Sequence, residues 1–297
     1  MAIMIVAGCL TSQDVLREAE VVQKGLGGGK VIVLSNRTHS QIFSAIFVSP
    51  VGRVAVVDGG LYGDAENLTA VLKSLGGAVD VWYLTHAHCD HMGALTAMME
   101  QGVLSDEVRV KKLVFSFPPL PWLQQAEPRR FGHVRRFYAA LDKAASDVMV
   151  ERPAKGAVYD LGGRWTITPL NDYDLTIARP NINDTSICLS VDTAGRKWLV
   201  TGDIGRQVCG RIAEDLGPRL NHEFVFLSHH GQNGADKDFY AKVKPSVAIW
   251  PTPNWLWEND NGHGPGSGLF ETNRTKCWMQ DLGVRENHVL DKDVVFK

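Results

Sequence analysis

The sequence lacks the features that would tie the chain to a membrane, a disulfide framework or nucleic acid. No run approaches the 18 or more apolar residues of a membrane-spanning helix. The formal net charge is −2, so no overall basic surface argues for nucleic acid. The five cysteines are odd in number and scattered, which favours reduced thiols over disulfides. A nucleophile-elbow motif is also missing, which gives no support to serine-based hydrolysis.

The composition is that of an ordinary globular protein. Hydrophobic residues make up 44% of the chain and charged residues 22%. With 297 residues, the chain is long enough to bury a sizeable core in one large domain or two small ones.

The most informative stretch runs from residue 85 to residue 93. It contains four potential metal ligands within six positions: His86, His88, Asp90 and His91. An apolar run over 79–84 predicts a buried strand before it, and 93–102 predicts a helix after it. The ligands therefore fall in a strand-to-helix loop, where imidazole and carboxylate groups suit a cation such as zinc. Cys89 is interpreted as a spacer within this motif.

This spacing resembles the His-x-His-x-Asp-His signature of the metallo-β-lactamase superfamily. The resemblance implies an α/β fold, an αββα sandwich with two β-sheets face to face and helices outside. It implies that 30–297 form a single domain. The helical composition of 11–24, followed by a glycine-rich break, is interpreted as part of a lead-in segment over 1–29. The resemblance also implies two metal sites, metal one bound by His86 and His88 and metal two bound by Asp90 and His91.

Further site residues follow from the same resemblance at the ends of predicted strands. Asp58 is implied to orient a ligand histidine, although the residues alone equally allow a simple turn aspartate. Asp203, in a Thr-Gly-Asp strand end, is implied to bridge the two metals. A final metal-two histidine is expected in the pair His229–His230. We expect His229, the first residue past the strand, to be that ligand and His230 to support it.

One departure from the family pattern narrows the substrate. Residues 181–185 read Asn-Ile-Asn-Asp-Thr where many members have a histidine, so metal one lacks a third histidine. Together with Gly-Asp and His-His-Gly, this segment resembles a subgroup containing DNA-uptake lactamase domains and bacterial phosphorylcholine esterases. Those proteins act on phosphodiesters. The implied cofactor is one or two Zn²⁺ ions per chain, with Mn²⁺ or Fe²⁺ as alternatives.

The long segment over 251–264 is too irregular for a simple connection and is interpreted as a substrate wall. By resemblance, His263 faces the substrate and acts as a catalytic group. Trp255 and Trp257 are candidate substrate-binding residues that stack on a base or hold a quaternary ammonium group. The alternative is a loop folded on its own aromatic residues. A helix predicted over 127–148 carries several arginines, which we interpret as a solvated face.

The function favoured by these motifs is hydrolysis of a phosphodiester by a metal-bridged hydroxide opposite Asp203, with Asp90 holding metal two. The first alternative is hydrolysis of a carboxylic ester, lactone or thioester at the same dinuclear site. The second is a metal-binding or polymer-binding module without turnover. A redox di-iron role is disfavoured by the Asp90–His91 pair. The expected partner is a small-molecule or phosphodiester substrate rather than a stable nucleic-acid partner, and the oligomeric state stays open.

The compartment depends on how the first residues are read. A cytoplasmic protein is expected. Residues 5–9 nevertheless look like the cleavage box of a bacterial lipoprotein, although a positively charged region before them is missing. Either this similarity is accidental, or the chain begins inside a longer signal sequence and is anchored to the cell envelope through Cys9.

Overall fold

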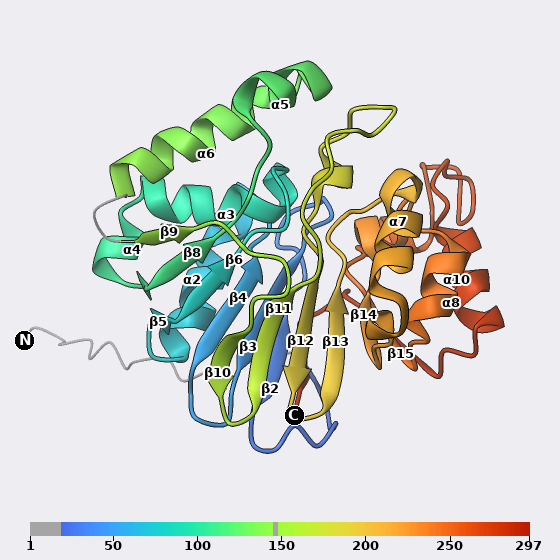
Figure 1. Cartoon of the computed structure of the whole chain (residues 1–297), viewed down its shortest axis with the longest axis horizontal. Coiled ribbons are helices and arrows are strands. Elements are labelled where there is room, and N and C mark those ends of the chain that lie inside the picture. The colour runs from blue at the N-terminus through green and yellow to red at the C-terminus, as the bar shows by residue number, and fades with distance from the viewer. Residues whose placement is uncertain (1–18, 145–147) are drawn as a thin grey trace, which may run out of the picture.

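The computed structural model describes residues 19–144 and 148–297 as two β-sheets packed face to face between layers of helices (Figure 1). Among these residues the first sheet has eight strands, in the order β1-β17-β2-β3-β4-β6-β8-β9. Their bounds are β1 Glu20–Val22, β2 Lys30–Val33, β3 Ser44–Val48, β4 Val54–Asp58, β6 Val81–Tyr83, β8 Lys112–Val114, β9 Met149–Glu151 and β17 Val294–Phe296. The predicted αββα sandwich is thereby confirmed.

The second sheet has seven strands within the described residues, in sequence order from β10 to β16. Their bounds are β10 Tyr159–Gly162, β11 Trp165–Pro169, β12 Leu189–Thr193, β13 Arg196–Val200, β14 Phe224–Phe226, β15 Val247–Trp250 and β16 Glu286–Val289. A short separate pair joins β5 (Ala78–Val79) to β7 (Arg109–Val110).

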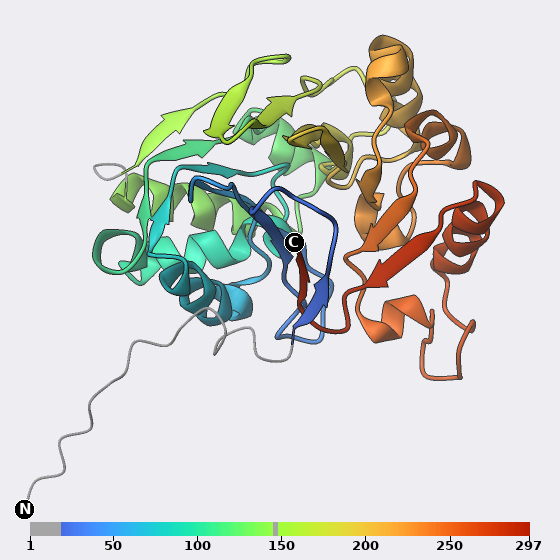
Figure 2. The same ribbon diagram turned by 90° about the horizontal axis from the view of Figure 1, so that it is seen from below.

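Helices lie on the outer face of the first sheet and over the β14 and β15 side of the second (Figure 1 and Figure 2). Over the first sheet and its connections lie α2 Ala65–Ser74, α3 Cys89–Glu100, α4 Val103–Asp106, α5 Leu120–Ala126 and α6 Phe131–Ala144. Over the second lie α7 Arg206–Leu216, α8 Lys237–Val243, α9 Asn254–Trp257 and α10 Thr272–Asp281. Short 3₁₀ turns are η1 Tyr62–Asp64, η2 Asn183–Thr185, η3 Gly217–Leu220 and η4 Ser228–Gly231.

Strand β4 shows how the sandwich buries both faces of a sheet. Its side chains alternate, because successive residues of a strand point to opposite faces. Val54 and Val56 pack under the helices, whereas Ala55 and Val57 pack between the two sheets. A continuous apolar strand ending in Asp58 is therefore the pattern required of a strand covered on both sides.

The first described residues correct the predicted lead-in segment. Residues 20–22 belong to the predicted helix over 11–24 but form β1 and pair in parallel with β17, while residues 11–18 lie outside the described residues. Helical composition is a weak preference, and here the unpaired edge of β17 overrides it. The sheet consequently begins at Glu20, upstream of the expected boundary at residue 30. Cys9, on which the lipid-anchor alternative rests, lies outside the described residues.

The predicted helix over 127–148 is also wrong at its start. The chain forms two helices, α5 and α6, and residues 127–130 connect them. Pro128 explains the break, because the residue before a proline is disfavoured in the helical region. Glu127 accordingly has φ −140° and ψ 74°. The break sends the segment 127–130 toward the rim of the sandwich instead of along a solvated helix.

Among the described residues, none of the helices is both long and apolar enough to cross a membrane.

Candidate metal centre

The candidate site lies at one rim of the sandwich, where strands of both sheets end. In the first sheet β4 and β6 run parallel, and in the second β13 and β14 do so. Parallel neighbours bring their carboxyl ends to the same edge, so the segments that follow them meet there. These segments carry the buried polar residues Asp58, His86, His88, His91, Asp203 and His230.

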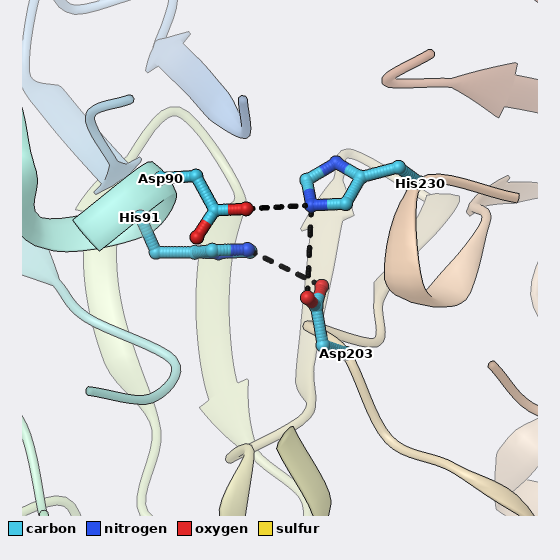
Figure 3. Close-up of side chains that lie close together, drawn as sticks. All are labelled: Asp90, His91, Asp203 and His230. Carbon is cyan, nitrogen blue, oxygen red and sulfur yellow. Dashed lines mark ion pairs between the residues drawn. The ribbon is translucent and has the colours of Figure 1, made fainter. Parts of the chain in front are cut away.

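The first group of potential ligands joins Asp90, His91, Asp203 and His230 (Figure 3). The ring of His230 lies between the two carboxylates, with its Nε2 3.3 Å from Asp90 Oδ2 and 3.6 Å from Asp203 Oδ2. The Nε2 of His91 lies 3.3 Å from Asp203 Oδ1. Both Nε2 atoms are buried, and neither has a hydrogen-bond partner among the described residues. Two buried imidazole nitrogens aimed at two carboxylates form a donor set that suits a divalent cation.

The second group joins His86, His88 and Asp203. His86 Nε2 lies 3.1 Å from His88 Nδ1 and 3.7 Å from Asp203 Oδ2. Asp203 therefore belongs to both groups and offers an oxygen to each. This is the position that the family resemblance implies for a bridging aspartate.

In the first group, outward-facing nitrogens fix the orientation of the rings. His91 Nδ1 donates to Asp58 Oδ2 over 2.7 Å, and His230 Nδ1 donates to the carbonyl oxygen of Pro251 over 3.0 Å. Asp58 itself is held by Thr85, whose backbone N–H and hydroxyl donate to its two oxygens over 2.8 and 2.7 Å. These partners leave each Nε2 without a proton in the neutral ring, which is the form that binds metal.

The imidazole rings of the second group are also oriented by hydrogen bonds, one of them to a residue that the sequence did not indicate. His86 Nδ1 donates to Thr85 Oγ1, and His88 Nε2 donates to Glu127 Oε2 over 3.0 Å. The inner nitrogens of both rings then present lone pairs to each other across 3.1 Å, an arrangement that a shared cation stabilises. Glu127 also accepts from the backbone N–H of Ile182 over 3.2 Å. The only local signal for Glu127 is the proline that follows it.

The electrostatics of the centre also favour a cation. Burial raises the pKa of Asp203, but the charges of His91, His230 and His86 lower it well below its usual value. Burial likewise raises the pKa of Asp90, and the contact with His230 outweighs it, so that the net pKa is lowered. Both carboxylates are therefore ionised beside the imidazole rings, and a cation bound between them would balance their negative charge.

The pKa values of His91 and His86, one from each ligand group, are shifted in opposite directions. Burial lowers the pKa of His91, but the neighbouring Asp203 and Asp58 carboxylates raise it well above its usual value. His86 is lowered well below its usual pKa, mainly because burial disfavours its charged form. Burial raises the pKa of Glu127, and the hydrogen bond from His88 more than reverses this, so Glu127 stays ionised. A charged Glu127 is the form that holds His88 in the required tautomer.

The order of the paired histidines was predicted wrongly. His230, not His229, joins Asp90 and Asp203. Both residues have left-handed backbone conformations, with φ 50° at His229 and 56° at His230, so the chain turns sharply as it leaves β14. Gly231 completes the turn at φ 76°, where a Cβ atom would meet the Trp250 ring at 2.5 Å. Position along an extended strand therefore does not decide which ring points inward.

His229 instead faces the cleft that opens beside the centre. Its Nε2 accepts from Asn183 Nδ2 over 3.2 Å and lies 4.0 Å from Asp203 Oδ2. About a quarter of the side chain, 25%, is exposed. Burial of the rest lowers the pKa of His229. Asn183 occupies the segment that lacks the family's histidine, and its Oδ1 is buried without a hydrogen-bond partner among the described residues.

The cleft has a volume of about 770 Å³. It is lined by His88, Glu127, Pro128, Arg129, Arg130, Arg179, Pro180, Asn181, Asn183, Gln207 and His229. The segment between α5 and α6 forms one wall, and the loop between β11 and η2 forms another. Both lie at the same end of the molecule (Figure 1). The arginines interpreted as a solvated helix face thus belong in part to this cleft.

The predicted substrate wall lies elsewhere. In the part of the chain that the structure describes, His263, Trp255 and Trp257 do not line the cleft, and His263 is exposed. Trp257 packs edge-on against Trp250, with ring centroids 5.0 Å apart, and lies 3.8 Å from Lys276 Nζ.

Trp255 makes a similar internal contact with Phe270, and its Nε1 donates to the carbonyl oxygen of His39 over 2.9 Å. Both tryptophans thus contact residues outside the segment over 251–264, away from the cleft. A Gly-His motif and nearby tryptophans did not predict the position of this loop, because tertiary packing rather than sequence distance sets it.

Comparison with known proteins places this geometry in a family. A family model described as the metallo-beta-lactamase superfamily matches residues 40–252. The chain belongs to this superfamily. Its curated relative ComE operon protein 3 of Bacillus subtilis (strain 168) is 25% identical over 176 residues, which are 58% of this chain and 20% of that protein. The chain thus matches about a fifth of that relative's length, and the relative fits the subgroup that the sequence motifs suggested.

Solved structures agree on the fold. Zn(2+)-bound PqqB from Methylobacterium extorquens has a TM-score of 0.51 at 12% identity, covering 90% of this chain and 99% of its own. The diiron β-hydroxylase CmlA from Streptomyces venezuelae has a TM-score of 0.52 at 14% identity, covering 90% and 54%. These two proteins differ in the metal named for them. Likeness at this level supports the shared fold, and the metal has to be argued from the ligands.

Proposed function

We propose that this metallo-β-lactamase-fold protein is a metal-dependent hydrolase of phosphodiesters. The observation that carries the proposal is the pair of buried ligand groups that share Asp203 beside an open cleft. A phosphodiester brings a negative charge that two adjacent cations match, whereas a carboxylic ester or lactone brings none. The departure at residues 181–185 and the His-His-Gly segment support the same substrate class through their resemblance to phosphodiester-acting members.

The residues assigned to the cofactor follow from the two groups. His86, His88 and Asp203 would hold one ion, and Asp90, His91, Asp203 and His230 would hold the other. Two divalent ions held there would supply an acidified water and would stabilise charge on the attacking and leaving oxygens. Zinc fits the imidazole-rich donor set, and manganese or iron are the alternatives.

The protein's own contribution is orientation. Asp58 and the Pro251 carbonyl hold His91 and His230, and Glu127 holds His88, so the ligand rings need no rearrangement when substrate arrives. We assign to His229 the role first expected of His263. Its Nε2 faces the cleft beside Asn183 and is within reach of a substrate oxygen placed at the centre.

The test combines metal analysis with a substrate panel. The protein is purified without chelator, its metal is measured by elemental analysis, and turnover is followed on bis-p-nitrophenyl phosphate, a choline phosphodiester, a cephalosporin, a lactone and a thioester. We expect between about one and two ions per chain and hydrolysis of the diesters. A preference for lactones or thioesters over every diester would replace the proposed substrate class with the carboxylic alternative. Metal without turnover on any substrate would favour a binding module.

A further inference from the structure

The cleft beside the metal centre carries a charge opposite to that of the whole chain. Its lining includes three arginines and one carboxylate, Glu127, which gives 3 − 1 = +2 with its histidines neutral. The whole chain has a formal net charge of −2. A positive cleft in a slightly negative protein concentrates anions locally. We call Arg129, Arg130 and Arg179 the arginine rim.

Two of the three members of the arginine rim have guanidinium groups without a protein partner. In the described ranges, the guanidinium groups of Arg129 and Arg179 form neither an ion pair nor a hydrogen bond, whereas Arg130 lies 3.7 Å from Glu127 and 3.5 Å from His88 Nε2. Elsewhere, Arg136 pairs with Glu100 at 2.7 Å and Arg196 pairs with Glu223 at 2.6 Å.

The backbone that carries the arginine rim is nevertheless anchored. The N–H of Arg179 donates to Gln207 Oε1 over 2.9 Å, and Gln207 Nε2 donates back to the Arg179 carbonyl over 3.0 Å. Pro128 precedes Arg129 and Pro180 follows Arg179, and proline restricts the backbone at both places. On the cleft wall formed by residues 127–130, Glu127 accepts hydrogen bonds from His88 Nε2 and from the backbone N–H of Ile182. Fixed backbones with unpaired guanidinium groups form a site prepared for an anion.

We propose that the arginine rim is a subsite for a second anionic group of the substrate, a phosphate or carboxylate beyond the scissile diester. The inference rests on the proposed function, because the metal centre accounts for the charge of the diester itself and leaves the rim unmatched. Guanidinium groups bind phosphate and carboxylate oxygens through paired N–H donors. A volume of about 770 Å³ lies within the range of small-molecule sites, so we assign the subsite to a small phosphodiester rather than to a polymer.

The test uses p-nitrophenyl phosphodiesters of a two-carbon alcohol that ends in a hydroxyl, a carboxylate or a phosphate. Wild-type protein should prefer the two anionic ends in kcat/KM by about tenfold or more. Arg129→Gln and Arg179→Gln should each lower kcat/KM for those substrates by about tenfold and change it less than about twofold for the hydroxyl end. Which of the two anionic ends is preferred distinguishes a phosphate from a carboxylate ligand.

Arg109→Gln is the matched control, because Arg109 is exposed on β7 and does not line the cleft within the described residues. Equal kcat/KM for all three ends, or equal losses in the control and the rim variants, would overturn the subsite while leaving the proposed function intact. Preference for an oligonucleotide over all three small diesters would overturn the assignment to a small molecule.

A binding measurement separates failure of the subsite from failure of the proposed function. Inorganic phosphate is titrated by equilibrium dialysis into metal-loaded wild-type protein and into the Arg129→Gln/Arg179→Gln double variant. Loss of a weaker class of phosphate site in the double variant, with metal content unchanged, would support the arginine rim even if no diester is hydrolysed. Identical isotherms for the two proteins would overturn it.

Discussion

The two ligand groups share Asp203 but differ in how completely the protein holds them. With Asp203 included, the group of Asp90, His91 and His230 offers four ligands. Its imidazole rings are oriented by a buried carboxylate and a backbone carbonyl. The group of His86 and His88 offers three, and one ring is oriented by Glu127, whose side chain is 22% exposed. The four-ligand group is therefore held by buried partners, whereas the three-ligand group depends on a segment that also forms the cleft wall.

The largest effect is expected from replacing Asp203, the residue that both ligand groups share. Asp203→Asn should deplete both sites and lower kcat by at least about 10²–10³-fold, as expected for the loss of a preorganised electrostatic group. Elemental analysis and turnover of the preferred substrate measure the two effects. Asp192→Asn serves as the control. Asp192 lies in the β12–β13 hairpin, and its carboxylate accepts a hydrogen bond from the backbone N–H of Gly195. Full occupancy of both sites in Asp203→Asn would contradict a shared ligand.

The paired histidines should separate metal binding from substrate contact. His230→Ala should empty mainly the four-ligand site, because His230 Nε2 lies between Asp90 and Asp203. His229→Ala should keep the metal and lower kcat by roughly 10²–10⁴-fold, the usual contribution of a positioned acid or base. Metal content and kcat are measured on both variants. The opposite pattern would restore His229 as the ligand.

Glu127→Gln should sharpen the contrast between the two sites. The amide cannot supply the charge that holds His88, so the affinity of the three-ligand site should fall by about 10–100-fold while the four-ligand site is unchanged. A competition titration with a chromogenic chelator resolves the two affinities. Glu100→Gln is a suitable control, since Glu100 pairs with Arg136 on the surface. Equal weakening of both sites would show that Glu127 acts on the fold as a whole.

The smallest effects on turnover are expected from substitutions in the segment over 251–264. His263→Ala and Trp255→Ala should change kcat and KM by less than about twofold, because their side chains lie outside the cleft. Trp257→Ala should instead lower stability by about 1–3 kcal/mol through its lost packing on Trp250, with metal content unchanged. Thermal unfolding and steady-state kinetics distinguish the two cases. A large fall in kcat for His263→Ala would return this loop to the active site.

The features of this protein that depend on a local pattern of residues could be predicted from the sequence. Four ligands within residues 86–91 follow a buried strand and open a helix, so their positions relative to one another are set by a single turn of chain. Apolar strands such as β4, which ends in Asp58, could be predicted from their composition, whereas the αββα arrangement was implied by the resemblance to the metallo-β-lactamase superfamily and was confirmed. Because these strands are covered on both faces, their register leaves few alternatives.

The remaining features depend on contacts between segments that are distant in the sequence. A left-handed turn packed against Trp250 decides which of the two adjacent histidines points inward. Histidine is not a residue type that predicts such a turn. Glu127 reaches His88 from 39 positions away because a proline breaks the helix there. Trp257 packs on the buried Trp250, and Trp255 contacts Phe270 at the surface, since covering an aromatic ring is favourable wherever another side chain accepts it. Contacts between distant segments depend on packing, and packing cannot be read from neighbouring residues alone.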